Sequence, residues 1–404
     1  MKCIGGVLAF AMGFAAISGS AAAPAPKEYF VYFGTYTGFQ FINKGRPTGK
    51  SQSKGIYVSR FRPDTGEVTA PQVAAEVVNP SFLAIDPTHR FLYALTEDPL
   101  SLGPFLDKGS FVNAFAIDPA TGKLTLLNTK PSGGTSACYI SIDKSGKNVL
   151  IANFGSGTIA VLRVNEDGSL GEQSASVQQT GSSVHPLYQT GPHAHSIDVS
   201  PDNRFVIVSD LGSDKVLVYR FDAAAGSLTP NNPPSVKVKP GYGPRHFIFH
   251  PNGKVGYLMT EMGGTVITYA WDASRGVLTP IQETNTVPKD YVPFAVGSDN
   301  HSAEVVVLPT GKFLYDSNRG PDTIGVLLVN PSDGTLSLIE QASACGLLPR
   351  SIEVDPTGSY LLAANQATDN VIIYHIESQT GRILPTRQTL KLDAPVCIKF
   401  MPVE

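Results

Sequence analysis

The chain has 404 residues and a formal net charge of −3, and 16% of its residues are charged. This near-neutral balance gives no electrostatic reason to expect nucleic acid or an anionic membrane surface as a partner. The four cysteines lack clustered spacing, which excludes a disulfide-rich scaffold and a zinc site. We expect free thiols, with a single disulfide left open.

The first residues have the pattern of a secretory signal peptide. Lys2 provides a positive charge, residues 4–17 form a short apolar core, and Ser20-Ala21-Ala22 has the form of a cleavage site. The sequence therefore predicts a leader over residues 1–22, a mature domain over residues 23–404, and export to the periplasm or the medium. A membrane anchor is the alternative, but the apolar core is too short for one.

A unit of about 50 residues recurs along the mature domain, as expected of the four-stranded blades of a propeller. Each unit opens with a small residue or proline, usually followed by a polar residue. An apolar strand, a tight turn, two further strands and often a Thr-Gly turn into a fourth strand then follow. Six complete units begin at Pro80, Ala137, Ala194, Pro244, Ala303 and Pro349.

The two ends of the chain supply a seventh unit. Residues 29–36, 55–61 and 65–69 match a second strand, a third strand and the turn into a fourth, whereas residues 394–401 match a first strand without a successor. We therefore predict an all-β, seven-bladed β-propeller with four-stranded blades, whose ring is closed by the C-terminal strand completing the N-terminal blade. An open β-solenoid or two β-sandwiches are the alternatives, but neither gives a divided blade a purpose.

The heads of the first strands should surround one mouth of the central channel, because first strands are innermost in a propeller. These positions are Ser81, Cys138, His195, Arg245, Glu304, Arg350 and Val396. The adjacent ends of the second strands contribute Thr96, Glu97, Asn153, Asp210, Glu261, Asn318, Arg319, Asn365 and Gln366. Because the ends of an antiparallel hairpin meet, we also expect Arg245 to pair with Glu261.

Two interpretations of this mouth are open. One is an ion-paired, water-filled channel plug, because ion-pair networks also collect charged residues. The other is a polar small-molecule site, in which arginines bind an anionic substrate while carboxylates and an imidazole transfer protons. The mixed residue types at equivalent positions favour the second, because a purely structural repeat would tend to hold similar residues in each copy.

The motifs at these positions resemble those of the seven-bladed propeller lactonase family, which includes the propeller-type bacterial 6-phosphogluconolactonases and the fungal carboxymuconate-lactonising cyclases. The motifs are PHAHS at 192–196, GPRH at 243–246, Glu261, AE at 303–304, SNRG at 317–320, PR at 349–350, ANQ at 364–366 and PVCIKF at 395–400. The resemblance implies catalytic roles for His195, Arg245, Glu261 and Arg319. Neighbouring polar residues are expected to bind substrate, namely Glu97, His193, Asp210, Glu304, Asn318, Arg350 and Gln366.

The leading hypothesis is hydrolysis of a sugar-acid lactone without metal or cofactor. His195 or Glu261 would deprotonate a water molecule, while Arg245 and Arg319 would hold the anionic group of the substrate and stabilise the oxyanion. The same residues could run the opposite chemistry, as in a lactonising cyclase, by adding a carboxylate across a double bond.

Two further hypotheses remain. His193 and His195 could share a strand face as metal ligands, with His185, His246 or His301 as a third. A non-enzymatic exported propeller could instead bind a small anionic ligand or a protein. As partners the sequence predicts a small-molecule lactone or sugar acid, no nucleic acid and no membrane, for a monomer or weak homodimer.

Overall fold

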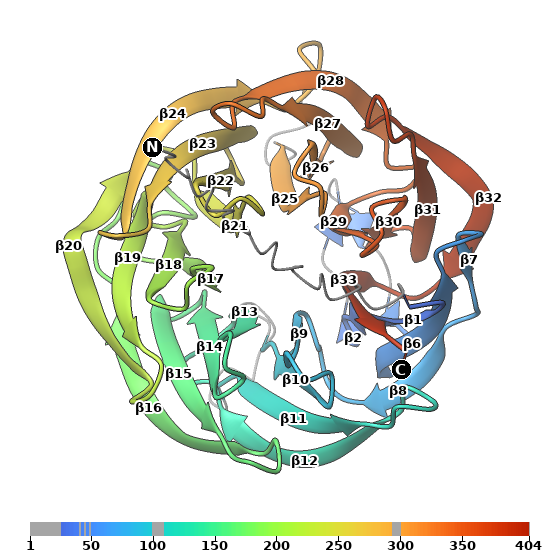
Figure 1. Cartoon of the computed structure of the whole chain (residues 1–404), viewed down its shortest axis with the longest axis horizontal. Helices are drawn as coiled ribbons and strands as arrows, with labels where there is room; N and C mark the ends of the chain where they lie inside the picture. Colours follow the sequence, from blue (N-terminus) through green and yellow to red (C-terminus); the bar gives the residue numbers. More distant parts are fainter. Residues whose placement is uncertain are drawn as a thin grey trace, which may run out of the picture.

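Seven antiparallel sheets stand side by side around a common axis in the computed structural model, which confirms the predicted propeller (Figure 1). The structure describes residues 26–403 apart from 40–41, 44–45, 48–49, 99–108 and 293–299. The signal peptide predicted over residues 1–22 lies outside the described residues. Within the described part of the chain, no helix is long and apolar enough to cross a membrane.

Blades are numbered in chain order, and the innermost strand of each is given first. Blade 1 contains β33 (Pro395–Pro402), β1 (Tyr29–Thr35), β6 (Gly55–Arg62), β7 (Glu67–Val68) and β8 (Gln72–Glu76). Blade 2 contains β9 (Leu83–Ile85), β10 (Phe91–Thr96), β11 (Phe111–Ile117) and β12 (Leu124–Pro131). Blade 3 contains β13 (Ala137–Ile142), β14 (Asn148–Asn153), β15 (Thr158–Val164) and β16 (Leu170–Gln178).

The remaining blades repeat this plan. Blade 4 contains β17 (Ala194–Val199), β18 (Phe205–Asp210), β19 (Lys215–Asp222) and β20 (Ser227–Lys237). Blade 5 contains β21 (Pro244–Phe249), β22 (Val255–Thr260), β23 (Thr265–Asp272) and β24 (Val277–Asn285). Blade 6 contains β25 (His301–Val307), β26 (Phe313–Arg319), β27 (Thr323–Val329) and β28 (Leu336–Ser343). Blade 7 contains β29 (Pro349–Val354), β30 (Tyr360–Asn365), β31 (Asn370–Ile376) and β32 (Ile383–Lys391).

Two short ladders lie between β1 and β6. They pair β2 (Gly38–Phe39) with β5 (Lys50–Ser51), and β3 (Ile42–Asn43) with β4 (Arg46–Pro47). Neither ladder belongs to a blade, so they form an excursion at the end of the second strand of blade 1.

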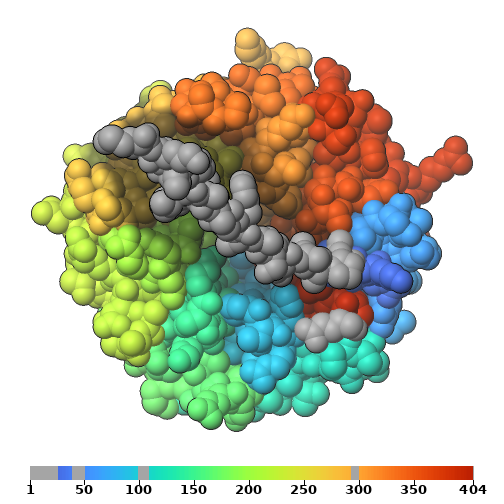
Figure 2. All heavy atoms as spheres, in the orientation of Figure 1, coloured from blue at the N-terminus to red at the C-terminus, as the bar shows by residue number. Residues whose placement is uncertain are grey.

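The ring closes where the two ends of the chain meet. β33 pairs antiparallel with β1 in a register that runs from Tyr29 opposite Pro402 to Thr35 opposite Pro395. The red C-terminal strand accordingly lies beside the blue N-terminal strands (Figure 1), and red and blue atoms adjoin in the space-filling view (Figure 2). The predicted divided blade is therefore confirmed, and closure leaves no blade without a neighbour.

Aspartates shape several of the turns between the first and second strands. Asp86 Oδ1 accepts hydrogen bonds from the backbone N–H groups of Arg90 and Phe91, at 2.8 and 2.7 Å. Asp143 and Asp355 make the equivalent pair of bonds in blades 3 and 7. A short side chain that bonds the backbone in this way fixes the turn locally.

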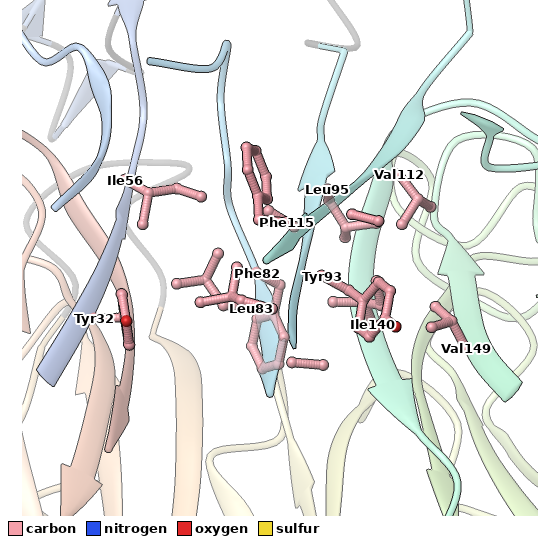
Figure 3. Packing of buried hydrophobic residues seen from close by; sticks show 14 of the residues in the cluster. Tyr32, Ile56, Phe82, Leu83, Tyr93, Leu95, Val112, Phe115, Ile140 and Val149 are labelled. Atoms are coloured by element: carbon pink, nitrogen blue, oxygen red, sulfur yellow. The ribbon is translucent and has the colours of Figure 1, made fainter. Parts of the chain in front are cut away.

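Buried apolar side chains fill the space between neighbouring blades. Tyr32, Leu83, Tyr93 and Val149 belong to one cluster that joins blades 1, 2 and 3, and Figure 3 shows them spread across the neighbouring sheets, with Leu83 and Tyr93 between Tyr32 and Val149. Buried tyrosines of second strands also donate their hydroxyl hydrogens to a glycine carbonyl of the next blade. These bonds measure 2.8–2.9 Å and join Tyr32 to Gly122, Tyr93 to Gly168, Tyr257 to Gly334 and Tyr315 to Gly381. Apolar packing thus drives assembly, and the hydroxyls fix the blade spacing.

Candidate active site

Six of the seven first strands contain a register shift at their heads. In β17, Ala194 pairs with Asp210 and Ser196 pairs with Ser209, so His195 has no partner across the ladder. Arg245 of β21, Arg350 of β29, Cys138 of β13 and Val396 of β33 occupy the same position. Such a β-bulge redirects a side chain without ending the strand. The predicted positions at the channel mouth are therefore mostly bulge residues.

The register of blade 6 differs from the prediction by one residue. Ser302 pairs with Asn318, so Ala303 rather than Glu304 takes the bulge position. Glu304 lies one residue deeper, and its Oε1 is 2.6 Å from Nδ1 of His246. The placement of Glu304 at the mouth is therefore wrong, because a one-residue slip along a strand turns the side chain to a different side.

Glu261, which directly follows β22, is the centre of the mouth. Its Oε2 accepts a hydrogen bond from Arg245 Nε at 2.9 Å, which confirms the expected pairing across the hairpin. Its Oε1 lies 3.1 Å from Arg319 Nη2 and 3.0 Å from His301 Nδ1. His195 Nε2 is 3.6 Å from Oε2. Residues of blades 4, 5 and 6 thus converge on one carboxylate, and we call these five residues the mouth cluster.

The charges of the mouth cluster fix the ionisation of Glu261. Burial opposes its charged form, but Arg319, the hydrogen bond from His301, and Arg245 together hold the pKa of Glu261 well below its usual range. At neutral pH the carboxylate is ionised, so it can only accept hydrogen bonds. A carboxylate that already faces several donors is also a weak base.

His195 is nearly enclosed, with 7% of its side chain exposed. Its ring lies edge to face against Phe154 and His246, with centroids 5.4 and 5.3 Å away, and its Nδ1 is 3.8 Å from the thiol of Cys138. Burial and the positive charge of Arg245 hold the pKa of His195 well below its usual value, so the imidazole is neutral.

Arg350 differs from the other two arginines of the mouth. Its guanidinium lies over the ring of Tyr36, 5.2 Å from the centroid, and Tyr36 donates its hydroxyl hydrogen to Glu97 Oε2 at 2.8 Å. Among the described residues, no carboxylate forms an ion pair with Arg350. A stacked but unpaired guanidinium can bind an anionic ligand in the bidentate geometry that arginine favours.

Several residues predicted to bind substrate are occupied elsewhere. Asp210 is fully buried and accepts hydrogen bonds from two backbone N–H groups and from the Ser213 hydroxyl at 2.5 Å. Asn318 is also buried, and its Nδ2 donates to Asp316 at 3.0 Å. The Asp210 side chain thus stabilises the turn that follows β18, and the Asn318 side chain joins β26 to the carbonyl oxygen of Thr286. Substrate binding by either residue stays a prediction. Gln366 follows β30 at the position that Glu261 takes after β22, and it is buried.

His193 lies just before β17 and holds the turn of the preceding blade. Its Nδ1 is 2.8 Å from the carbonyl oxygen of Phe154, and the two rings are stacked with centroids 4.6 Å apart. The described residues contain no group of three or more His, Cys, Asp or Glu side chains arranged to hold a metal ion. His193 and His195 are thus not part of such a group.

His301 is the member of the mouth cluster that sequence reasoning missed, since it was considered only as a metal ligand. The ladder aligns His301-Ser302-Ala303-Glu304 with His193-Ala194-His195-Ser196. Ser302 pairs with Asn318 and Ala194 pairs with Asp210, and both of these partners lie opposite the first residue of their third strand. Aligning residues 301–304 with residues 193–196 in the sequence, so that Ser302 matches Ala194, would have placed His301 at the mouth.

A second group of charged residues lies at the opposite end of the first strands, around a cavity of about 420 Å³ that we call the far cavity. Lys399 Nζ contacts Glu353 Oε2 at 3.0 Å, and Tyr139 donates its hydroxyl hydrogen to Asp198 at 2.8 Å. Glu304 also lines this cavity. Burial raises the pKa of Asp198 and of Glu304 to about 7.

Comparison with known proteins decides the family. The sequence pattern described as "Lactonase, 7-bladed beta-propeller" matches residues 30–400. The chain belongs to this lactonase family. It is 34% identical to a 6-phosphogluconolactonase of Bacillus subtilis over 93% of this chain and 99% of the relative, and 34% identical to one of Formosa agariphila over 86% and 95%. The resemblance drawn from the motifs, and the expectation of a lactonase enzyme, are confirmed.

A solved structure agrees with this assignment. The periplasmic gluconolactonase of Pseudomonas aeruginosa superimposes with a TM-score of 0.83 at 30% identity, covering 93% of this chain and all of that one. The likeness spans the ring of blades and is not restricted to one motif.

Proposed function

We propose that this lactonase opens a sugar-acid lactone by water attack, with the reacting ring bound over the mouth cluster. The observation that carries the proposal is the convergence of Arg245, Arg319, His195 and His301 on the ionised Glu261. Relatives named 6-phosphogluconolactonase and gluconolactonase support a substrate of this class. The proposed reaction needs no metal or cofactor.

Arginine supplies the electrostatic part of the reaction. Among the described residues, Nη2 of Arg245 and Nη1 of Arg319 have no hydrogen-bond partner, so each retains donors for a developing oxyanion. A preorganised donor of this kind contributes about 10²- to 10³-fold to the rate. Arg350, for which the described part of the chain contains no ion-paired carboxylate, would hold the anionic group of the substrate at the neighbouring blade.

The ionised state of Glu261 assigns it a supporting role. Arg245 and Arg319 already neutralise it, and a carboxylate with a strongly lowered pKa removes protons poorly. Its contribution is to fix the two guanidinium groups and the histidines around one point. His195 and Glu261 remain the two residues whose replacement tests the site.

The test is hydrolysis of glucono-δ-lactone and of its 6-phosphate by the purified mature protein, followed by proton release, with the uncatalysed rate subtracted. We expect turnover by the wild type and loss of at least 10²-fold in kcat/KM for His195→Ala and Glu261→Gln. Binding of both lactones without turnover would reassign the chain as a binding propeller. Lactone formation from an unsaturated dicarboxylate, with no hydrolysis, would reassign it as a cyclase.

We also propose that the protein is exported. The support is the leader pattern of residues 1–22, together with the periplasmic location stated for the Pseudomonas aeruginosa relative. N-terminal sequencing of the protein from a periplasmic or culture fraction should show a start at Ala23, and an intact Met1 in a cytosolic fraction alone would contradict export.

A further inference from the structure

The proposed reaction lacks a strong base, and the geometry of His301 supplies one. His301 Nδ1 lies 3.0 Å from Glu261 Oε1, at hydrogen-bond distance. Because Glu261 is ionised and only accepts, Nδ1 must carry the hydrogen, and the lone pair of the neutral ring is therefore on Nε2. Among the described residues, Nε2 of His301 has no hydrogen-bond partner.

His301 is also accessible, whereas His195 is not. The side chain of His301 is 24% exposed, compared with 7% for His195. The 3.6 Å separation of His195 Nε2 from Glu261 Oε2 is too long for a good hydrogen bond. Within the described ranges, no carboxylate therefore fixes the tautomer of His195, while Glu261 fixes that of His301.

The backbone of His301 is held as firmly as its ring. His301 pairs with Arg319 across the ladder of β25 and β26, and its carbonyl oxygen accepts a hydrogen bond from Arg319 Nε at 2.8 Å. The charged and titratable groups around the ring are Glu261 and Arg319, with Tyr188 edge to face at a centroid distance of 5.8 Å. One arginine thus contacts both the histidine backbone and the carboxylate that orients its ring.

We propose that His301 is the general base of the lactonase reaction and that Glu261 is its positioning residue. This inference rests on the proposed function. The arrangement matches the general requirement that a base be oriented by a third group on its far nitrogen.

The step balances without any further reactant. Nε2 of His301 takes a proton from water as the water oxygen bonds to the lactone carbonyl carbon, and the carbonyl electron pair moves to its oxygen. Glu261 stabilises the imidazolium, and the free N–H groups of Arg245 and Arg319 stabilise the oxyanion. When the tetrahedral intermediate collapses, the ring C–O bond breaks and the leaving oxygen takes the proton from Nε2. The product is the hydroxy acid, and His301 is again neutral.

The test compares His301→Gln and His301→Ala with His375→Gln, which replaces an exposed histidine of β31 in blade 7. We expect kcat to fall on the order of 10²- to 10⁴-fold in both His301 variants with KM little changed, as for loss of a general base. Added imidazole should restore part of the rate of His301→Ala, whereas a purely structural loss would not respond. His375→Gln should retain the wild-type rate.

The role of Glu261 gives an independent check. In Glu261→Gln the loss should fall on kcat rather than on KM, because the ring of His301 is no longer oriented by an ionised carboxylate. A loss confined to KM in Glu261→Gln, or wild-type kcat in His301→Gln, would overturn the inference while leaving the proposed function intact. Absence of turnover by the wild type would instead refute the proposed function.

Discussion

The two ends of the central channel hold similar residues in opposite electrostatic states. At the mouth, Glu261 is within ion-pair distance of two arginines, and its pKa is held well below the usual range. In the far cavity, Lys399 forms an ion pair with Glu353, and burial raises the pKa of Asp198, Glu304 and Glu353. The number of cations per carboxylate therefore decides which end carries fixed charge and which end titrates near neutrality. A fixed set of charges is the state that catalysis requires.

The largest effect is expected when one carboxylate is neutralised at each end of the channel, which tests whether the two ends differ in function. Glu261→Gln leaves two buried guanidinium groups without their counter-charge, so we expect the free energy of unfolding to fall by about 3 kcal/mol and kcat/KM to fall at least 10²-fold. Urea denaturation and lactone hydrolysis measure the two effects. Glu353→Gln, at the far cavity, is the matched control and should retain turnover. If Glu353→Gln lost as much kcat/KM as Glu261→Gln, the two ends of the channel would not differ in their contribution to catalysis.

Replacing Arg350 tests whether the mouth binds the anionic group of the substrate. Arg350→Ala should raise KM for an anionic lactone about 10- to 100-fold, because a charge-assisted hydrogen bond to the substrate is lost. Stability should hardly change, since Arg350 has no ion-paired carboxylate among the described residues. A neutral lactone measured with the same variant is the control. If both lactones lose affinity equally, Arg350 does not bind the anionic group.

The raised pKa of Asp198 in the far cavity should make the free energy of unfolding depend on pH. An unfolded aspartate titrates near pH 4, whereas burial raises the pKa of folded Asp198 to about 7. Between these values the folded state holds a proton that the unfolded state has lost, so stability falls as the pH rises from about 4 to about 7.

Asp198→Asn should remove this loss and make the protein more stable than the wild type above pH 7, by up to about 4 kcal/mol at about 1.4 kcal/mol per pH unit, but not near pH 4. Urea titrations at pH 4.5, 6 and 7.5 measure the difference. Replacing the exposed Glu166 of blade 3 by Gln should leave the pH profile unchanged. If the free energy of unfolding of Asp198→Asn changed with pH in parallel with that of the wild type, the raised pKa of Asp198 would be contradicted.

The smallest effect is expected at Cys138, which lies beside His195 at the mouth. Burial raises the pKa of this thiol, so it stays protonated and does not act as a nucleophile. Cys138→Ala should change kcat/KM by less than about twofold. A thiol reagent should label the exposed Cys345 of the folded protein but neither Cys138 nor Cys397. Inactivation that follows labelling of Cys138 would place the thiol in the reaction.

The ring and its closure could be predicted from the sequence because both rest on periodic patterns. The divided blade follows from matching residues 29–36 and 394–401 to strands that each lack a partner. The contact of Arg245 with Glu261 follows from hairpin geometry alone, since the two residues flank one turn.

The details of the mouth depend on register, which the sequence pattern does not specify. Glu304 and His301 were misplaced because Ala303 resembles the small residue that leads other first strands, while Ser302 takes that position in the ladder. Asp210 looked like a free carboxylate, but its oxygens bond the turn that follows β18. Side chains at strand ends can face either the channel or the local backbone, and only the folded chain decides between them.

The pairing of β1 with β33 has a consequence for how the molecule is made. β1 leaves the ribosome well before its inner partner in blade 1, β33 (Pro395–Pro402), because more than 300 residues separate them in the chain. At about 5–20 residues per second, the inner edge of β1 waits roughly 20–80 s for its partner. Until β33 is synthesised, the inner edge of β1 is unpaired and can pair with other chains. A chain that stalls before β33 therefore keeps this aggregation-prone edge exposed, and pairing of β33 with β1 removes it.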